Sequence, residues 1–311
     1  MPELAALDVL LAVAHAGSLN AAAPEIGISQ QAVSARMSAL EALTGVRLLN
    51  RSRIGSTLTS EGVVVAEWAA RVLDAAHELD VGLTALRAGH RSRLRVSASL
   101  TVAEHLLPGW LVSFRAAARA RREELADVTL TAANSSVVTE HVRADAADVG
   151  FIESPTVAAG LRSKVVAYDE LVLVAQPDHP LVRRRRPVDA ALLGRTALVS
   201  REAGSGTRDA LAGALRTALG PGQRQADPLL ELSTTSAIRG AVQAGAGPAV
   251  LSELAVADDL ASGRLVRIPV TGLDLRRPLR AIWLGTRAPP AGPVRDLIAH
   301  ITSRPSRDPI S

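Results

Sequence analysis

The stretch SQQAVSARMSALEALTG, residues 29 to 45, decides how the N-terminal part of this chain is interpreted. Its apolar residues recur at helical spacing, at Val33, Met37, Leu40 and Leu43. The opposite face carries short or planar hydrogen-bonding side chains and little charge. A solvated helix would normally place Lys and Glu there. The stretch therefore predicts a helix whose exposed face is shaped to contact another molecule.

The residues before this helix have the spacing of a helix-turn-helix. That motif needs a small residue where two helices cross, a turn residue that tolerates positive φ, and an apolar residue that locks the second helix. Ala23, Gly27 and Val33 supply these, four and six residues apart. The second helix of such a motif lies in the major groove of DNA, with its first turn at the base edges. We therefore predict that the quoted stretch reads double-stranded DNA.

The predicted DNA contacts lie on this helix and on the segment after it. Glutamine can bind adenine bidentately, serine can lie close to the duplex, and arginine reaches guanine or phosphate. The segment VRLLNRSRIGSTLT, residues 46 to 59, resembles a β-ribbon whose arginines can lie over phosphate or the minor groove. The predicted contacts are Gln30, Gln31, Ser34, Ala35, Arg36, Ser38, Arg51 and Arg53.

Three residues predict the ends and irregularities of the first helices. Ser18 and Ser29 are placed to cap the two helices of the motif. Pro24 falls inside the supporting helix, where it removes one N–H and crowds a carbonyl one turn earlier. We expect that helix to start late or to kink.

Residues 59 to 88 form one long helical pattern. Apolar residues alternate four and three apart along it, which is a heptad seam typical of a helix paired with a second copy of itself. The alternative is that this helix packs on its own domain. The seam consists of Val65, Ala69, Val72, Ala76, Leu79, Leu83 and Leu86.

From residue 93 the period changes to short β-type runs with helical patterns between them. Alternating strands and helices predict parallel sheets covered on both faces. About 210 residues of this kind suit two lobes better than one sheet. Helical patterns are expected at residues 102 to 119, 135 to 145, 207 to 219, 234 to 244 and 293 to 302.

Composition narrows the class of protein. The chain has 311 residues, of which 48% are apolar and 21% charged, with no Cys and a net charge of +4. The lack of Cys excludes disulfides and thiolate catalysis. Apolar runs stay below the roughly 18 residues that span a bilayer, and the first residues lack the basic start of an export signal. We expect a cytoplasmic protein with no membrane contact.

The motifs together resemble the LysR-type transcriptional regulators. The resemblance runs through AAAPEIGISQQAVSARMSALEALTGVRLLNRS, then LTSEG, and continues through ADVGFIES, LVSREAGSGTRDAL and STTSAIRGAVQAGAGPAVLSELAV. It implies a winged helix-turn-helix, a homodimer joined by the long helix and usually paired into a homotetramer, and RNA polymerase as a partner. It also implies a C-terminal domain like a periplasmic binding protein, which binds a small-molecule effector between two lobes.

The resulting fold is a multidomain α/β chain. Its expected parts are a winged helix-turn-helix over residues 1–58, a linker and dimerisation helix with a hinge over 59–90, and an effector-binding domain over 91–303. Lobe I is expected at about 91–161 and 269–303, and lobe II at about 162–268.

Hydroxyl side chains cluster where strands give way to helices in the C-terminal half. Ligands of open α/β folds bind at the carboxyl ends of strands, and helix N-termini there favour negative charge. Each hydroxyl could instead simply cap its helix. Read with the resemblance, the pattern predicts an anionic or polar effector and no other cofactor. The predicted effector contacts are Ser99, Leu100, Thr101, Ser135, Ser136, Ser205, Thr207 and Thr234.

Other classes of protein fit less well. The histidines form no metal-ligand pair, and GSGTR at 204 to 208 lacks the lysine of a phosphate loop, so we expect neither a metal site nor catalysis. The basic run at 183 to 186 is either a solvated loop or a second DNA contact. The remaining alternative is a small-molecule binding protein of periplasmic type without a role on DNA.

Overall fold

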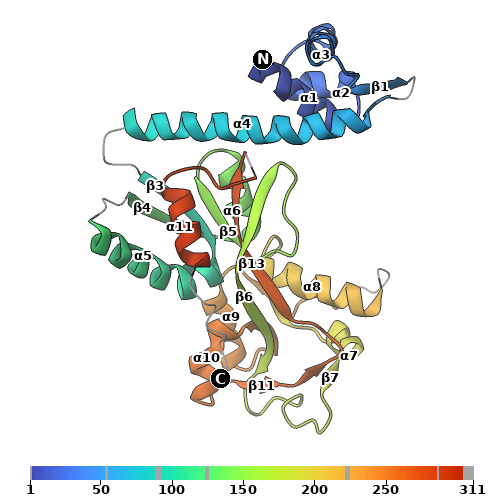
Figure 1. Ribbon diagram of the computed structural model, residues 1–311. Coiled ribbons are helices and arrows are strands. Elements are labelled where there is room, and N and C mark those ends of the chain that lie inside the picture. The colour runs from blue at the N-terminus through green and yellow to red at the C-terminus, as the bar shows by residue number, and fades with distance from the viewer. Residues whose placement is uncertain are drawn as a thin grey trace. The chain divides into compact units, whose positions relative to one another are not determined.

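A computed structural model describes residues 2–52, 55–87, 93–122, 126–220, 225–285 and 287–303 (Figure 1). The chain divides into two compact units, residues 1–87 with 286–291, and residues 88–285 with 292–311. Each unit is described by itself below.

The first unit is a helix-turn-helix followed by a ribbon and a long helix. Its elements are α1 (Leu4–Ala16), α2 (Leu19–Glu25), α3 (Gln30–Thr44), β1 (Leu49–Ser52), β2 (Gly55–Leu58) and α4 (Ser60–Arg87). Ser18 and Ser29 cap α2 and α3 as predicted, by accepting hydrogen bonds from Ala21 N and Ala32 N at 3.0 and 3.2 Å. Gly27 lies in the turn with φ of 67°.

Of the two outcomes expected for Pro24, a late start or a kink, the structure excludes the late start. The helix begins at Leu19, directly after its cap, and Pro24 falls in its last turn. A proline there removes one hydrogen bond near the end of the helix, where the ladder is about to stop. Ile28 N instead reaches back to Ala23 O at 3.1 Å and closes the turn.

The long helix α4 packs on its own domain at its N-terminal end and is exposed further along. Ala66 and Ala69 are buried in the core of the first unit, and Val65 packs against that core. The proposed seam was therefore wrong at its start, where the alternative holds. Further along, Val72 and Leu79 of the predicted seam are exposed, together with Val64 and Trp68, which the sequence did not assign to it. The side chains of Leu83 and Leu86 lie outside the described residues.

Lobe I of the second unit is built on the first strands of a mixed sheet. Its elements are β3 (Arg93–Ser99), η1 (Val102–Leu106), α5 (Leu107–Arg121), β4 (Asp127–Ala133), α6 (Ser135–Arg143), β5 (Val149–Ile152) and α11 (Pro293–Thr302). Strands β4, β3 and β5 are parallel neighbours. Trp283, Phe151 and Leu297 are among the residues of the core under this sheet.

Lobe II holds the remaining elements, several of which are short. They are β7 (Val188–Asp189), α7 (Ala190–Arg195), β8 (Val199–Arg201), α8 (Gly206–Leu219), β9 (Leu230–Leu232), α9 (Thr235–Gln243), β10 (Ala249–Ser252), α10 (Glu253–Ala261), β11 (Val266–Ile268) and β12 (Val270–Thr271). The sequence did not predict α7 or the shortest strands, because segments of two to six residues carry little periodicity. It also did not predict α10, which has nine residues.

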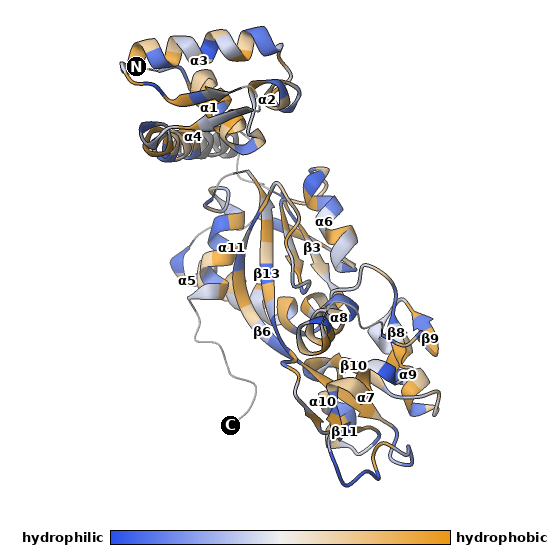
Figure 2. Ribbon diagram, turned by 90° about the vertical axis from the view of Figure 1, so that its right-hand side faces the viewer, coloured by the Kyte–Doolittle hydropathy of each residue, from blue (hydrophilic) through white to orange (hydrophobic). Residues whose placement is uncertain are grey.

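Two long strands join the lobes. Strand β6 (Leu161–Ala175) and strand β13 (Arg276–Leu284) run antiparallel to each other (Figure 1). The first part of β6 pairs with β13 in lobe I, and its last part pairs with β10 and β11 in lobe II. The prediction of parallel sheets is therefore only partly confirmed, since β3, β4 and β5 are parallel but β13 and β10 run antiparallel to their neighbours. Figure 2 shows hydrophobic residues along the shared strands.

Candidate functional site

Helix α3 is held in one rotation about its axis. Val33, Met37 and Leu40 are buried in the core of the first unit. Gly45 ends the helix in the left-handed conformation with φ of 74°, and its N–H donates to Glu41 O at 2.9 Å. Leu43 was expected in the buried row but is 57% exposed. Three buried residues on successive turns are enough to fix which side of α3 faces solvent.

The side of α3 that faces solvent carries most of the predicted DNA contacts. Ser34 is half-buried at its margin. The exposed members are Gln30, Gln31, Ala35, Arg36 and Ser38. These side chains offer hydrogen-bonding groups of short reach and one arginine, which suits base edges and phosphates.

The ribbon of β1 and β2 is tied to the C-terminal end of α3 by one carboxylate. Glu41 Oε1 accepts hydrogen bonds from Leu48 N at 2.8 Å and from Leu49 N at 3.2 Å. The backbone of Arg51 lies in β1, opposite Ser56. The side chain of Arg51 and the whole of Arg53 lie outside the described residues.

In the second unit, a buried arginine joins predicted effector residues from both lobes. Arg277, at the start of β13, is 3% exposed. Its Nη1 donates to Thr207 Oγ1 of lobe II at 3.0 Å, and its Nη2 donates to Thr101 Oγ1 of lobe I at 3.3 Å. We call the buried residues around this guanidinium, from both lobes, the interlobe centre.

Two carboxylates share this guanidinium. Asp169 lies opposite Arg277 in the β6–β13 register, and its Oδ2 accepts from Nε at 2.9 Å and from Nη2 at 2.7 Å. Its other oxygen accepts from Ser252 Oγ at 2.8 Å. Glu153, which follows β5, brings Oε2 to 2.5 Å from Nη2. The centre therefore combines one cation with two anions, all buried.

Other hydroxyls of the predicted set border the centre. Ser135 Oγ accepts from Glu153 N at 3.3 Å. Ser99 Oγ and Ser205 Oγ are buried and have no hydrogen-bond partner within the part of the chain that the structure describes. Ser205 precedes α8 without capping it through its side chain. For Ser205 the helix-cap alternative therefore does not hold.

The remaining predicted effector residues lie apart from the buried centre. Thr234 is exposed and caps α9, accepting from Ala237 N at 3.1 Å, so for this residue the cap alternative holds. Ser136 is exposed, and its N–H donates to Gly204 O at 3.1 Å. Leu100 is half-buried after β3.

The two lobes touch directly beside the centre. A Cβ at Gly206 would come within 2.5 Å of Glu153 Cγ, and one at Gly204 within 2.6 Å of Ser136 Oγ. Glycine is required at both positions for this close approach. At these two points the lobes leave no room for one further carbon atom.

An ion pair lies at the edge of the same contact between the two lobes. Glu202 receives both sides of the Arg201 fork at 2.8 Å and accepts from Asn134 of lobe I at 3.1 Å. Burial alone would raise the pKa of Glu202, but the hydrogen bonds from Arg201 and Asn134 outweigh it and lower the pKa. Glu202 is therefore ionised when it bridges the lobes.

Sequence reasoning missed the charged members of the centre, namely Arg277, Asp169 and Glu153. Two of them gave a signal: Asp169 interrupts an apolar strand, and Arg277 opens another. A charged residue inside a buried strand needs a partner, because an unpaired buried charge is costly. The partner could not be identified without the register of β6 against β13.

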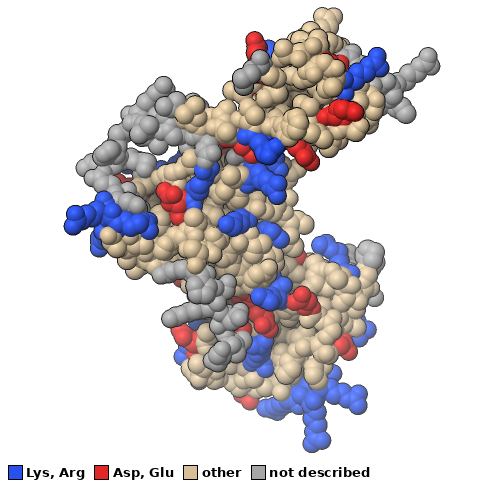
Figure 3. All heavy atoms as spheres, viewed as in Figure 1, with Lys and Arg blue, Asp and Glu red and all other residues tan. Residues whose placement is uncertain are grey.

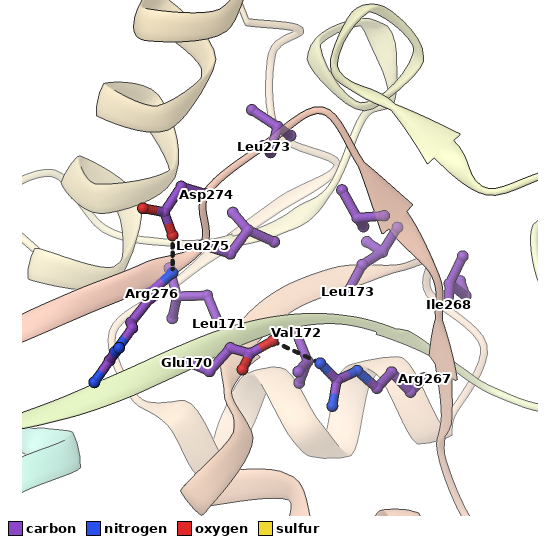
Figure 4. Close-up of a pocket in the computed structure, with 11 residues that line it drawn as sticks. Glu170, Leu171, Val172, Leu173, Arg267, Ile268, Leu273, Asp274, Leu275 and Arg276 are labelled. Carbon is purple, nitrogen blue, oxygen red and sulfur yellow. Dashed lines mark hydrogen bonds and ion pairs between the residues drawn. The ribbon is translucent and has the colours of Figure 1, made fainter.

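The pocket in Figure 4 lies in lobe II, away from the predicted effector residues. It encloses about 220 Å³ between β6, β11 and the start of β13. Arg267 bridges Glu170 and Glu253 there, at 2.7 and 2.8 Å. Because these charged side chains already pair with one another, the pocket offers a ligand few unpaired charged groups.

The basic run at 183 to 186 is exposed in the loop before β7. Figure 3 shows Lys and Arg gathered at the foot of the view, where Figure 1 places that loop. Arg183 pairs with Asp178 at 3.1 Å.

Within the described ranges, no group of three or more His, Cys, Asp or Glu could hold a metal ion. Among the same residues, no single helix is long and apolar enough to cross a membrane. Helices α1 and α2 reach that measure only together, and they bend by 118° at their junction.

Comparisons with known proteins agree with this architecture. The profile described as "Bacterial regulatory helix-turn-helix protein, lysR family" matches residues 4–63, and "LysR substrate binding domain" matches residues 87–305. An uncharacterized HTH-type transcriptional regulator of Mycobacterium tuberculosis is 54% identical over 304 residues, or 98% of this chain and 97% of that protein. The regulator CbbR of Xanthobacter flavus is 30% identical over 284 residues, or 91% of this chain and 81% of that protein.

Solved structures share the fold across almost the whole chain. Full-length OxyR from Pseudomonas aeruginosa gives a TM-score of 0.55 at 20% identity, covering 97% of this chain and 98% of that one. Full-length CbnR in complex with its target DNA gives 0.50 at 23% identity, covering 97% and 99%.

Proposed function

The chain belongs to the LysR family of DNA-binding transcriptional regulators, and from that premise we propose how its parts divide the work. The exposed face of α3 reads operator bases, α4 joins two copies, and the interlobe centre responds to an effector. The observation that carries the first assignment is the fixed rotation of α3, which turns Gln30, Gln31 and Arg36 outward. The alternative of a binding protein without a role on DNA has no support, because residues 4–63 match the helix-turn-helix profile.

We assign base reading to α3 and backbone contact to the ribbon. Gln31 and Arg36 lie near the start of the exposed face, where a recognition helix meets base edges. Arg51 and Arg53 are proposed to neutralise phosphates. This assignment is supported by full-length CbnR, which shares this fold and was solved in complex with its target DNA.

The test of the ribbon assignment is an Arg51→Ala variant. A lost phosphate contact should weaken binding to all duplexes alike and reduce the slope of log K against log salt by about one unit. Fluorescence anisotropy titrations at several salt concentrations measure both quantities. Arg162→Ala, which removes an exposed arginine from β6, is the control. An unchanged slope for Arg51→Ala would remove the ribbon from the DNA interface.

Self-association is assigned to α4. Val64, Trp68, Val72 and Leu79 recur at spacings of four, four and seven, which puts them on one side of the helix. Trp68 is 55% exposed and Leu79 64% exposed, which is costly for a lone protomer in water. A homodimer along this row, paired further into a homotetramer, would cover them.

Sedimentation velocity tests this assignment with a Trp68→Ser, Leu79→Ser double variant. We expect the dimer to dissociate at concentrations where the unchanged protein remains assembled. Leu284→Ser, which changes a similarly exposed residue of β13, should not alter the assembly. Sedimentation of the unchanged protein as a monomer would contradict the proposal.

The interlobe centre is proposed as the effector site. Hydroxyls and helix N-termini there support an anionic or polar ligand. The buried pair of Glu153 and Asp169 argues against a purely anionic molecule and favours a polar one. Native mass spectrometry of full-length protein purified without added ligand tests the proposal: a retained small molecule is expected, and its loss is expected in a Thr101→Val, Thr207→Val variant.

We also propose one further partner, RNA polymerase, and a place in the cell. A regulator that acts on DNA works in the cytoplasm and, by family resemblance, through RNA polymerase rather than through catalysis. In vitro transcription from a bound promoter, with and without the protein, tests the polymerase assignment. Equal transcript yields would contradict it.

A further inference from the structure

The formal charges of the interlobe centre do not balance. Arg277 supplies one positive charge, while Asp169 and Glu153 supply two negative charges. Each of the three is at most 3% exposed. A buried charge without compensation is costly, so the centre as it stands favours the arrival of one more positive charge.

The hydrogen atoms of Arg277 are also committed elsewhere. Nη2 carries two hydrogens, and the structure directs them to Asp169 Oδ2 and Thr101 Oγ1. Glu153 Oε2 lies 2.5 Å from Nη2 but receives no aligned hydrogen bond. This oxygen therefore forms an ion pair with Arg277 and receives no hydrogen bond from another described residue.

Two further buried hydroxyl groups, one from each lobe, belong to residues next to the segments that hold Glu153. Ser99 ends β3, beside the end of β5 that leads into Glu153. Ser205 comes directly before Gly206, whose Cα faces Glu153 closely enough that a Cβ would overlap it. Both Ser99 Oγ and Ser205 Oγ are buried without a hydrogen-bond partner in the described segments.

A primary ammonium group matches these unmet requirements. It carries one positive charge and three hydrogen-bond donors, and it has no acceptor. Glu153 Oε2 can accept one of these donors in addition to its ion pair with Arg277, and Ser99 Oγ and Ser205 Oγ, which can donate or accept, have no partner among the described residues. A carboxylate or phosphate would instead add a negative charge beside Glu153.

We propose that the interlobe centre binds a small polar molecule through a primary ammonium group, held by Glu153, Ser99 and Ser205. This inference rests on the proposed effector site and narrows the polar effector to an amine. Because Gly204 and Gly206 leave no room for a methyl group, the lobes separate to admit the ligand and close on the ammonium. Arg277 then remains on Asp169, and the ligand balances Glu153.

Thermal unfolding of the full-length protein with matched pairs of probes tests this inference. Each pair differs by an amine: ethanolamine against ethylene glycol, putrescine against 1,4-butanediol, glycine and β-alanine against acetate and propionate, all at equal ionic strength. At least one amine should raise the melting temperature by about 2–4 °C in a saturable way, while its amine-free partner does not. Stabilisation by the amine-free acids, or by no amine of the series, overturns the proposal.

Variants locate the effect. Glu153→Gln keeps the size of the side chain and removes its charge, so affinity for the stabilising amine should fall at least tenfold. Glu170→Gln, a carboxylate of the same strand system outside the centre, should retain it. If Glu153→Gln does not fold, Ser205→Ala removes one acceptor without touching a charge and should also weaken the amine. An unchanged affinity in the folded variant overturns the proposal.

A separate readout distinguishes this inference from the proposed function. DNA affinity of the unchanged protein is measured without any probe. DNA binding together with stabilisation by acetate or propionate alone would leave the regulator and its effector site standing and overturn only the ammonium assignment. Loss of sequence-specific DNA binding would instead overturn the regulator itself.

Discussion

The exposed face of α3 and the interlobe centre both gather polar side chains, but by opposite physical means. The α3 face lies in solvent, carries one arginine among uncharged residues, and is positioned by apolar residues on the far side of the same helix. The interlobe centre is buried and dense in charge, and it is positioned by the register of two long strands. A site on a surface needs only its scaffold to be rigid, whereas a buried site must also satisfy its own charges.

The largest expected effect comes from removing the cation of the interlobe centre. Arg277→Met leaves Asp169 and Glu153 buried without a cation, which should destabilise the protein by about 3–5 kcal/mol. Urea denaturation of the full chain measures this. Arg276→Met changes the exposed neighbour, which stacks on Tyr168 at 4.3 Å, and should cost under about 1 kcal/mol. Equal effects at both positions would remove the contrast between buried and exposed charge.

A second buried charge, in lobe II, tests whether burial alone explains the loss of stability expected for Arg277→Met. Asp259 is fully buried and accepts from Arg239, Gln243 and Arg264 at 2.7 to 2.9 Å. Its arginines are partly exposed, so Asp259→Asn should cost less than Arg277→Met, about 2–3 kcal/mol at neutral pH. Asp258→Asn changes an exposed neighbour and is the control.

The same contact carries a pH dependence of known sign. Burial would raise the pKa of Asp259, but hydrogen bonds from Arg264 and Arg239 outweigh it and lower the pKa. Its contribution to stability is therefore complete above the unfolded pKa, about 3.9, and is lost as pH falls through the lower folded value. The stability gap between the unchanged protein and Asp259→Asn should stay constant from pH 7 to 5 and shrink below about pH 4. A stability gap that widens in acid would contradict a lowered pKa of Asp259 in the folded protein.

How much of these sites the sequence could predict follows from the same contrast. Helical period and two capping serines sufficed to place Gln30, Gln31 and Arg36 on one exposed face, because every residue that fixes this face lies within α3 or next to it. Thr101 and Thr207 were predicted as ligand contacts, but Arg277, which joins them, was not. Its partners come from four separate segments, and only the β6–β13 register brings Asp169 opposite it.

Packing rather than charge should control the first unit. Gly62, in the first turn of α4, faces Leu48 O so closely that a Cβ would lie 2.1 Å from it. Gly62→Ala should destabilise the first unit by about 1–3 kcal/mol, because backbone atoms must move. Gly109→Ala, in α5, meets no atom within 4 Å and should stabilise by up to about 1 kcal/mol. Circular dichroism melts measure both changes in stability. An unchanged stability of Gly62→Ala would contradict the close approach of Gly62 to Leu48 O.

The smallest expected effect lies on the exposed face itself. Gln31→Ala should leave stability within about 0.5 kcal/mol of the unchanged protein, because the residue is exposed. It should relax base preference at one position of each half-site at a cost of about 1–3 kcal/mol. Competition binding with single-base variants of the operator measures that preference. A loss of folding stability would mean that the α3 face is not a free surface.

The most direct test of the central claim is selection of random-sequence duplexes by the full-length protein, repeated with Gln31→Ala and Arg36→Ala. We predict one enriched motif with two related half-sites about one helical turn, or a multiple of it, apart, and a changed preference in each variant at the bases it reads. Enrichment of no motif, or of the same motif in all three proteins, would contradict the assignment of α3 as the reading element.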